Sequence, residues 1–381
     1  MARKKILIVA GEPSGDLHAS NLAKNLLSID PDLVFYGLGG ERSKKAGVEV
    51  IFDISGLALV GVIEVVKNIF TVGKAFRAVL SRIDLERPDL AVLVDYPGFN
   101  LRLAKALKKR SIPVVYYISP QVWVWGADRI GIIKDCVKKI LVFFKFEEDL
   151  YKKHGVNAEF IGHPLVESVH MGLSRNEAAR KFGLSAGKRT IALLPGSRRM
   201  EVENLLPIMA KACRKMSEDG LDAQYLVAKH PELDIELYQR ALAKTSIDAR
   251  IVDGDTYNII GVSDFAIVAS GTATLETAII GTPLVVIYKT NPLTAMIARL
   301  VANVKILGLV NILAGREIAP EFLQENATPE KIAAGVKELL SDDIKLARMR
   351  EELARVKDSL GGPGASARGA SAVYEVLKNP K

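Results

Sequence analysis

The sequence predicts an α/β protein with two doubly wound domains, each a parallel sheet covered by helices on both faces. Short, nearly continuous apolar runs alternate with helical patterns, which is typical of buried parallel strands. The alternation starts again after a polar linker at residues 163–188. The 381 residues also exceed one ordinary core at about 150 residues per domain.

In the first half, the aliphatic run Lys5–Ala10 predicts a strand, and a Gly-Pro-Ser turn then opens a helix from Leu17 to Leu27. Leu101–Lys109 has a helical period with a basic outer face. Runs rich in β-branched and aromatic residues predict further strands at Leu33–Leu38, Leu90–Val94, Val114–Ile118, Lys139–Phe143 and Glu159–Ile161.

In the second half, the strand Arg189–Leu194 is followed by a tight loop and a helix from Glu201 to Met216. Gly361-Gly-Pro-Gly interrupts the tail before a last amphipathic helix, Ala365–Leu377. The remaining expected strands are Tyr225–Ala228, Ala249–Val252, Phe265–Val268 and Pro283–Ile287, and the remaining helices are Arg175–Phe182, Pro329–Leu340 and Lys345–Ser359. Ligands of such folds bind at the carboxyl ends of the strands, so we expect a cleft there.

Composition excludes several classes of protein. With 49% hydrophobic and 25% charged residues, the chain has the average values of soluble globular proteins. No stretch approaches the ~18 apolar residues of a membrane span, and Met1–Lys5 is not followed by a secretory leader pattern. Cys136 and Cys213 lie far apart and the five histidines lack ligand spacing, so we expect a cytosolic protein without a catalytic metal.

The net charge of +8 favours an anionic partner. The basic residues lack the interleaved aromatics of a single-strand nucleic-acid groove, which disfavours nucleic acid. Between Val60 and Ile83, basic residues are interspersed among many apolar ones. This composition fits either a helix on an anionic membrane or an ordinary helix packed on its own sheet.

Three first-half motifs follow predicted strands. Gly11-Glu-Pro-Ser-Gly-Asp16 suits close backbone approach and anion binding at a helix start, although a turn capped by Ser14 or Asp16 explains it equally well. Asp95, in Asp-Tyr-Pro-Gly-Phe-Asn, is either a base for a substrate hydroxyl or part of a turn. The segment Ser119–Trp125 carries both tryptophans of the chain. These side chains either pack in the core or line an apolar or sugar-binding wall.

Two second-half loops favour a nucleotide diphosphate. In Pro195-Gly-Ser-Arg, backbone amides, a hydroxyl and a guanidinium converge, without the pattern of an ATPase P-loop, which favours phosphate binding over a merely structural turn. Ser270-Gly-Thr-Ala-Thr begins another helix with small hydroxyl residues, and Glu276 follows one turn later, where it could accept hydrogen bonds from ribose hydroxyls.

Together these motifs resemble lipid-A-disaccharide synthases, in that family's order and over nearly the whole chain. The first-half motifs and the Asn311 segment are specific to the family, whereas the two second-half loops are shared with other nucleotide-sugar transferases. Gly98 stands where some relatives carry a second Asp, which leaves Asp95 as the only carboxylate of its loop. The matching segments are Gly11–Asp16, Asp95–Asn100, Ser119–Trp125, Phe160–Pro164, Leu194–Arg198, Ala269–Ala273 and Asn311–Glu317.

The resemblance implies a glycosyltransferase of the GT-B type, with two Rossmann-like domains facing a central cleft. The family transfers 2,3-diacylglucosamine from UDP to the 6-hydroxyl of 2,3-diacylglucosamine 1-phosphate (lipid X). The products are a β-1′,6-linked disaccharide 1-phosphate and UDP. Because the configuration inverts, one displacement with one general base is enough, and no cofactor is implied.

The resemblance also implies residue roles. Asp95 would be the general base. The donor side would hold UDP with the loop residues Gly196, Ser197 and Arg198, with Ser270, Gly271, Thr272, Thr274 and Glu276, and with Asn311 and Arg316. The acceptor side would comprise Gly11, Glu12, Ser14, Gly15 and Asp16. The acyl-chain and membrane surface would comprise Val62, Val65, Val66, Ile69, Phe70, Phe76, Lys67, Lys74 and Arg77.

We therefore expect an acceptor and membrane-facing domain at residues 1–170, a UDP-sugar domain at 171–360 and a helix at 361–381 that crosses back to the first domain. The implied location is the cytoplasmic face of the inner membrane, as a peripheral protein. A homodimer remains open. Three alternative functions also remain open: a UDP-GlcNAc 2-epimerase, a peptidoglycan N-acetylglucosaminyltransferase and a non-catalytic nucleotide-sugar-binding protein.

Overall fold

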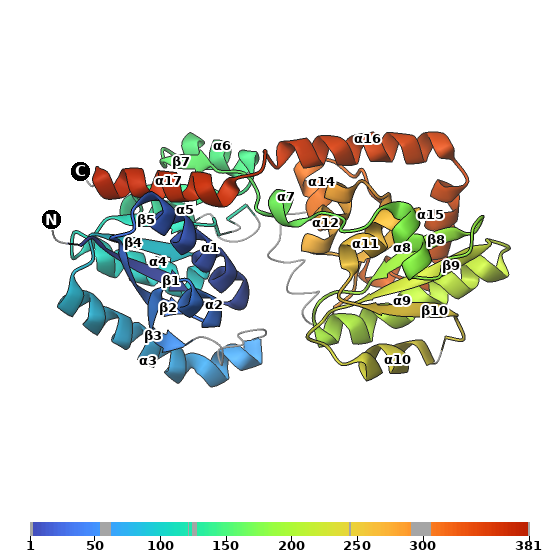
Figure 1. The fold of residues 1–381 in the computed structure, drawn as a ribbon, viewed down its shortest axis with the longest axis horizontal. Coiled ribbons are helices and arrows are strands. Elements are labelled where there is room, and N and C mark those ends of the chain that lie inside the picture. Colours follow the sequence, from blue (N-terminus) through green and yellow to red (C-terminus); the bar gives the residue numbers. More distant parts are fainter. Residues whose placement is uncertain are drawn as a thin grey trace. The chain divides into compact units, whose positions relative to one another are not determined.

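The chain folds into two compact units (Figure 1). The computed structural model describes residues 3–53, 62–120, 122–123, 128–243, 245–290 and 306–379, with the side chains of residues 62–69 and 128 left out of the description. The first unit joins Met1–Pro164 to Leu360–Lys381, and the second is Leu165–Ser359. The first boundary thus falls at Pro164, where the sequence suggested residue 170.

The first unit contains a parallel seven-stranded sheet in the order β3-β2-β1-β4-β5-β6-β7. Its strands are β1 (Lys5–Ala10), β2 (Val34–Gly39), β3 (Val48–Asp53), β4 (Leu90–Val94), β5 (Val114–Tyr117), β6 (Lys139–Val142) and β7 (Ala158–Phe160). Its helices are α1 (Pro13–Ile29), α2 (Glu41–Lys45), α3 (Val62–Glu86), α4 (Pro97–Lys108), α5 (Asp128–Cys136), α6 (Lys145–Lys153) and α17 (Ala365–Lys378).

Helices cover both faces of this sheet. On one face, Leu22 and Leu26 of α1 pack with Val373 and Leu377 of α17. On the other, α3, α4 and α5 contribute buried aliphatic side chains such as Val79. The last helix, red in Figure 1, therefore completes the core of the unit in which the chain begins.

The second unit contains a parallel six-stranded sheet in the order β10-β9-β8-β11-β12-β13. Its strands are β8 (Arg189–Leu194), β9 (Ala223–Lys229), β10 (Ala249–Asp253), β11 (Phe265–Ala269), β12 (Leu284–Tyr288) and β13 (Glu321–Leu323). Its helices are α7 (Leu165–Ser168), α8 (Arg175–Lys181), α9 (Arg199–Glu218), α10 (Ile235–Ala243), α11 (Thr256–Val262), α12 (Thr272–Ile280), α14 (Leu309–Ala314), η1 (Gln324–Asn326), α15 (Pro329–Leu340) and α16 (Asp343–Ser359).

The predicted fold class is confirmed, and every strand predicted from an apolar run is present. The sequence reading missed β3 and β13, which are edge strands. Most side chains of both are only partly buried, so neither strand has the continuous apolar run of a central strand. In the part of the chain that the structure describes, no helix is long and apolar enough to cross a membrane.

Candidate functional site

The loops after β1 and β4 are neighbours at the carboxyl edge of the first sheet. Ala10, the last residue of β1, pairs with Val94, the last residue of β4. Gly11 and Glu12 follow the first strand, and Asp95 follows the second. Parallel strands end at the same edge, so the sheet itself brings the predicted base to the predicted acceptor-side motif.

Asp95 lies on a strained turn. Asp95 and Tyr96 both have φ of +46°, in the left-handed region that residues with a side chain rarely occupy. Three hydrogen bonds fix the turn: the Asp95 amide donates to Tyr117 O (3.0 Å), and Asp95 O accepts from Asn100 Nδ2 (2.8 Å) and Tyr116 Oη (2.7 Å). Strain of this kind, about 1–3 kcal/mol per residue, persists only where surrounding contacts enforce it.

The Asp95 carboxyl is a weaker acid than usual. Burial, and secondly the charge of Glu12, raise its pKa to about 6, against an opposing backbone hydrogen bond from Tyr96. A neighbouring negative charge disfavours the ionised form of a buried carboxyl. Asp95 is therefore ionised at pH 7 while keeping a proton affinity suited to a general base.

Glycine at position 11 is required by packing. A Cβ there would overlap the Tyr96 ring, whereas one at Gly15 would meet Ala10 at an ordinary 3.5 Å. Ser14 is exposed at the start of α1, and Glu12 is half-buried. Of the acceptor-side residues, Gly11 packs against the Tyr96 ring beside Asp95, and Glu12 lies near enough for its charge to raise the pKa of Asp95.

Asp16 has a structural contact that the sequence reading did not foresee. Its buried carboxylate accepts hydrogen bonds from the amides of Gly40 (2.7 Å), Arg42 (3.1 Å) and Ser43 (3.2 Å), and from the Ser43 hydroxyl. Asp16 therefore caps α2 from another helix. Among the described residues, no side-chain hydrogen bond caps the start of α1 at Glu12, so the capping alternative applies to a helix other than the expected one.

A cluster of rings lies at the same edge, beyond β5 and β6. The Phe143 ring contacts His18 and His163 at centroid distances of 5.3 and 5.2 Å. Burial lowers the pKa of His18 to about 4, and burial followed by the nearby His18 lowers that of His163 to about 3. Both imidazoles are therefore neutral at pH 7, so this ring cluster carries no charge.

In the second unit, a carboxylate from the first turn of α9 holds the loop after β8. Glu201 Oε2 accepts from the amides of Ser197 (3.0 Å) and Arg198 (3.2 Å), and Glu201 Oε1 lies 3.6 Å from Arg198 Nη1. Gly196 has φ of +111°, and a Cβ there would overlap the Glu201 carboxylate. The exposed side chains of Ser197 and Arg198 are the groups that this loop offers to a ligand.

The loop after β11 is adjacent, because β8 and β11 pair directly. Its hydroxyls differ in availability. Thr274 is buried and donates to Gly271 O (2.8 Å), Ser270 donates to Leu307 O (3.1 Å), and Thr272 is exposed at the start of α12. Thr272 and the helix N-terminus are thus the parts of this motif best placed for a phosphate.

Glu276 lies one turn further into α12 and is partly buried. Its Oε1 accepts from Tyr257 Oη at 3.3 Å, and burial raises its pKa. A carboxylate held by one phenol keeps further acceptor positions for ligand hydroxyls.

Asn311 and Arg316 do not join these loops directly. Asn311 is fully buried, accepts from the amides of Ile318 (2.8 Å) and Ala319 (2.9 Å), and donates to Glu321 (2.7 Å). Arg316 pairs with Glu352 of α16 at 2.6 Å.

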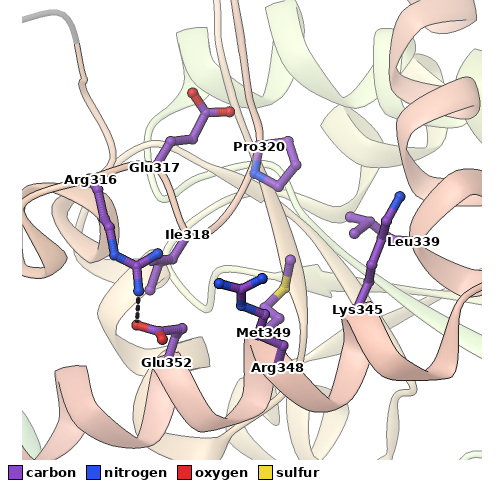
Figure 2. Close-up of a pocket in the computed structure, with 9 residues that line it drawn as sticks. All are labelled: Arg316, Glu317, Ile318, Pro320, Leu339, Lys345, Arg348, Met349 and Glu352. Carbon is purple, nitrogen blue, oxygen red and sulfur yellow. Dashed lines mark ion pairs between the residues drawn. The ribbon is translucent and has the colours of Figure 1, made fainter.

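Figure 2 shows Arg316 and Glu352 on the wall of a cavity of about 400 Å³. Pro320, which precedes β13, also lines the cavity, as does Met349, which accepts from the amide of Leu284 at the start of β12. This cavity is therefore at the amino edge of the sheet, opposite the two loops.

The predicted membrane surface is only partly described. The side chains of Val62, Val65, Val66, Lys67 and Ile69 lie outside the described residues. Of the others, Phe70 is 80% exposed and Lys74 and Arg77 are exposed on the same helical face. Phe76 instead points inward, with its ring 5.2 Å from that of Phe99, so it belongs to the core.

Sequence reasoning had left several site residues without a role. Tyr116 and Asn100 hold the Asp95 turn, and His18 and His163 pack on the Phe143 ring. The one signal in the sequence was the position of Asn100 within the Asp95 motif. Among the described residues, no group of three His, Cys, Asp or Glu side chains is arranged to hold a metal ion.

Comparison with known proteins gives consistent matches over the whole chain. The family described as "Lipid-A-disaccharide synthetase" matches residues 6–375. The lipid-A-disaccharide synthase of Syntrophus aciditrophicus (strain SB) is 43% identical over 379 residues, covering 99% of each chain. That of Geobacter sulfurreducens is 39% identical over 373 residues, covering 98% of this chain and 97% of the relative.

Among solved structures, MurG of Acinetobacter baumannii has a TM-score of 0.60 at 14% identity, covering 98% of this chain and 99% of that one. At this identity the likeness concerns the fold alone, and that fold is GT-B.

Proposed function

Because the chain belongs to the lipid-A-disaccharide synthase family, a family of glycosyltransferases of lipid A biosynthesis, we propose that it joins UDP-2,3-diacylglucosamine to lipid X. The products are the β-1′,6-linked disaccharide 1-phosphate and UDP. The observation that carries this proposal is the Asp95 carboxyl, fixed on a strained turn at the carboxyl edge of the first sheet with a pKa of about 6.

In the proposed reaction, Asp95 takes the proton of the acceptor 6-hydroxyl while that oxygen attacks C1 of the donor sugar. The bond from C1 to the diphosphate oxygen breaks, and its electron pair leaves with UDP. A single displacement of this kind inverts the configuration at C1. Tyr116 and Asn100 support it indirectly, since they hold the Asp95 backbone in place.

The donor would be held by the two adjacent loops of the second unit. The Arg198 guanidinium and the Ser197 hydroxyl are exposed beside Gly196, and the α12 N-terminus with Thr272 favours a second anionic group. Positive charge here would stabilise UDP as it departs. Glu276 would accept hydrogen bonds from the ribose hydroxyls.

The first test measures UDP release from UDP-2,3-diacylglucosamine, with and without lipid X, in the presence of EDTA. We expect release only with lipid X. Release without an acceptor would indicate a hydrolase or an epimerase instead, and no release under either condition would refute the substrate assignment.

Asp95→Asn should then lower kcat/KM by about 10²–10⁴, and Asp89→Asn is the matched control. Asp89 precedes the same strand at the opposite edge and pairs with Lys4 at 2.7 Å. It should leave the rate within about 2-fold of the unmodified rate, because a surface ion pair contributes little. Substantial activity in Asp95→Asn would argue against the general-base role.

We also propose that α3 binds an anionic membrane as a peripheral surface. Phe70, Lys74 and Arg77 share one exposed face, so an aromatic ring lies next to two cations. Such a face gains both from apolar burial at the lipid interface and from attraction to anionic lipids.

Vesicles containing phosphatidylglycerol should bind the protein at low salt and release it at high salt. The variant Lys74→Glu with Arg77→Glu should bind at least about 10-fold less, at about 1 kcal/mol per cation near the surface. Lys24→Glu with Lys105→Glu changes the net charge equally at exposed positions of α1 and α4. Equal loss of binding in this control would point to net charge rather than to α3.

A further inference from the structure

A buried carboxyl group with no role in the proposed reaction lies beneath the loop that follows β5. Glu147, in the first turn of α6, is only 4% exposed. Its Oε1 accepts a hydrogen bond from Trp123 Nε1 at 3.3 Å. No ion pair accompanies it in the described ranges, so this carboxyl is buried against neutral donors.

The same turn of α6 also holds the indole by its ring. Phe146 contacts Trp123 edge-on, with ring centroids 5.5 Å apart, and stacks on Phe144 at 5.7 Å. Trp123 is half-buried. Adjacent side chains of one helix thus fix the ring and the N–H of a tryptophan that still reaches the surface.

This contact is joined to the Asp95 turn through β5. Tyr116 of β5 donates to Asp95 O, and Ser119, just beyond the strand, shares a hydrogen bond of 3.0 Å with the fully buried Tyr151 of α6. Val94 pairs with Tyr117, so the loop carrying Trp123 leaves the sheet beside the loop carrying Asp95.

The next residue along α6 shows what a purely structural carboxylate looks like here. Glu148 is equally buried, but it pairs with Lys152 at 2.7 Å and with Lys145, and these contacts lower its pKa to about 2 against the opposing effect of burial. For Glu147, burial raises the pKa to about 7, against hydrogen bonds from Trp123 and Ser119. A buried carboxyl with no ion pair in the described ranges lowers the stability of the fold, which favours a functional reason for its presence.

We propose that Glu147 is a positioning residue, which holds the Trp123 indole at the carboxyl edge of the first sheet as a wall for the acceptor sugar. The apolar face of a sugar ring packs on an indole, whose rigid ring needs a fixed N–H partner to keep its orientation. The inference rests on the proposed function, since it assigns a place to the acceptor of that reaction.

Steady-state kinetics of Glu147→Ala, Glu147→Gln and Trp123→Phe test the proposal. Glu147→Ala and Trp123→Phe should each raise the acceptor KM about 10-fold or more, because each leaves one group of the buried hydrogen bond without its partner. The donor KM should not change, and kcat should stay within about 3-fold. Glu147→Gln keeps an acceptor oxygen and should stay within about 3-fold in every constant.

Two further variants separate positioning from general damage. Combining Glu147→Ala with Trp123→Phe should add less than about 2-fold to the larger single effect, because both changes break one contact. Glu148→Ala should lower Tm without changing the acceptor KM. An unchanged acceptor KM in Glu147→Ala, or an equal rise in Glu148→Ala or Glu147→Gln, would overturn the proposal. If Glu147→Ala does not fold, Trp123→Phe and Glu147→Gln give the same decision.

A second readout does not depend on turnover. The chain has two tryptophans, so Trp125→Phe leaves Trp123 as the single indole fluorophore. In that background, Glu147→Ala should raise acrylamide quenching about 2-fold, and Glu148→Ala should not. Normal quenching in Glu147→Ala would refute the contact itself. Absence of turnover in the unmodified chain, with quenching as expected, would instead refute the proposed function.

Discussion

At the scale of single residues, Asp95 combines three features that lower stability. Its backbone is left-handed, its side chain is buried, and Glu12 lies near enough to raise its pKa. Asn100 and Tyr116 hold it there with hydrogen bonds to one carbonyl oxygen, and Asn100 Oδ1 has no hydrogen-bond partner among the described residues. Such conflicts with local preference are expected where a group is kept for its chemistry.

The raised pKa predicts opposite effects of Asp95→Asn on stability and on activity. The folded pKa of about 6 exceeds the ordinary 3.8, so ionising Asp95 costs stability progressively between pH 4 and pH 6 and fully above it. Asp95→Asn should therefore have the higher Tm at pH 8, with the difference vanishing near pH 4. Its kcat/KM should be lower by about 10²–10⁴. Calorimetry and rate profiles check the two effects.

Glu12→Gln provides the control for this reasoning. Removing the neighbouring charge should shift the acidic limb of the kcat/KM profile below pH 6, because the charge of Glu12 is the second cause of the raised pKa. If the limb does not move, burial alone sets the pKa of Asp95, and the carboxylate pair has no electrostatic role.

Gly11 and Gly15 predict contrasting effects of the same substitution. Gly11→Ala places a Cβ into the Tyr96 ring and should cost about 1–3 kcal/mol, with lower turnover because the Asp95 turn must shift. Gly15→Ala adds a methyl group at ordinary contact distance inside α1 and should stabilise by about 0.5–1 kcal/mol. Denaturant unfolding of both variants measures the difference, and equal destabilisation would contradict the packing argument.

At the scale of elements, Asp16 links two helices. Its carboxylate supplies α2 with the acceptors that a helix N-terminus lacks. Asp16→Ala would leave buried amides without partners and should cost about 1–3 kcal/mol. The exposed Ser14→Ala should change the free energy of unfolding by less than about 0.5 kcal/mol. An Asp16→Ala variant with normal stability and a raised acceptor KM would instead support the predicted acceptor-side role.

The two arginines expected on the donor side should differ in how much their replacement weakens UDP binding. Arg198 is exposed beside the β11 loop, whereas Arg316 pairs with Glu352 at the amino edge. By calorimetric titration with UDP, Arg198→Ala should weaken binding about 10–100-fold, the loss of charge-assisted hydrogen bonds to a phosphate. Arg316→Ala should leave the Kd within about 2-fold. Equal losses would place Arg316 at the nucleotide after all.

The sequence predicted those features that depend on a pattern within one short segment of the chain. Apolar runs predicted the central strands, and the glycine loops after β1, β8 and β11 were predicted at the strand ends where they occur. Contacts between distant segments could not be predicted in this way. Asp16 meets Gly40, Trp123 meets Glu147, and Arg316 meets Glu352, and each pair depends on where two elements pack. Phe76 and Phe70 occur in similar sequence surroundings, yet Phe76 packs against Phe99 in the core and Phe70 is exposed to solvent.

At the scale of the whole molecule, the two units differ in how the chain builds them. The second is one continuous segment, Leu165–Ser359, and the first needs both ends of the chain. In the first unit α17 buries Val373, Val376 and Leu377 against α1 and the sheet. Each such side chain is worth about 1.5–3 kcal/mol, so the first unit depends on its last helix.

This difference predicts how fragments behave. A fragment of residues 165–359 should unfold cooperatively and bind UDP with the Kd of the full chain, because the proposed donor groups all lie within it. Residues 1–164 alone should aggregate or lack a cooperative transition, because the apolar surface beneath α17 is exposed.

Restoring residues 360–381 should rescue the first unit. The amide of His163 donates to Leu360 O at 2.8 Å, so a short Gly-Ser linker can join Pro164 to Leu360 without distortion. The joined chain should melt cooperatively by calorimetry, and changing Val373 and Leu377 to Asp in it should abolish that transition, since two unpaired charges would enter the core. A cooperative transition in residues 1–164 alone, at the same Tm, would show that α17 only covers a sheet that folds without it.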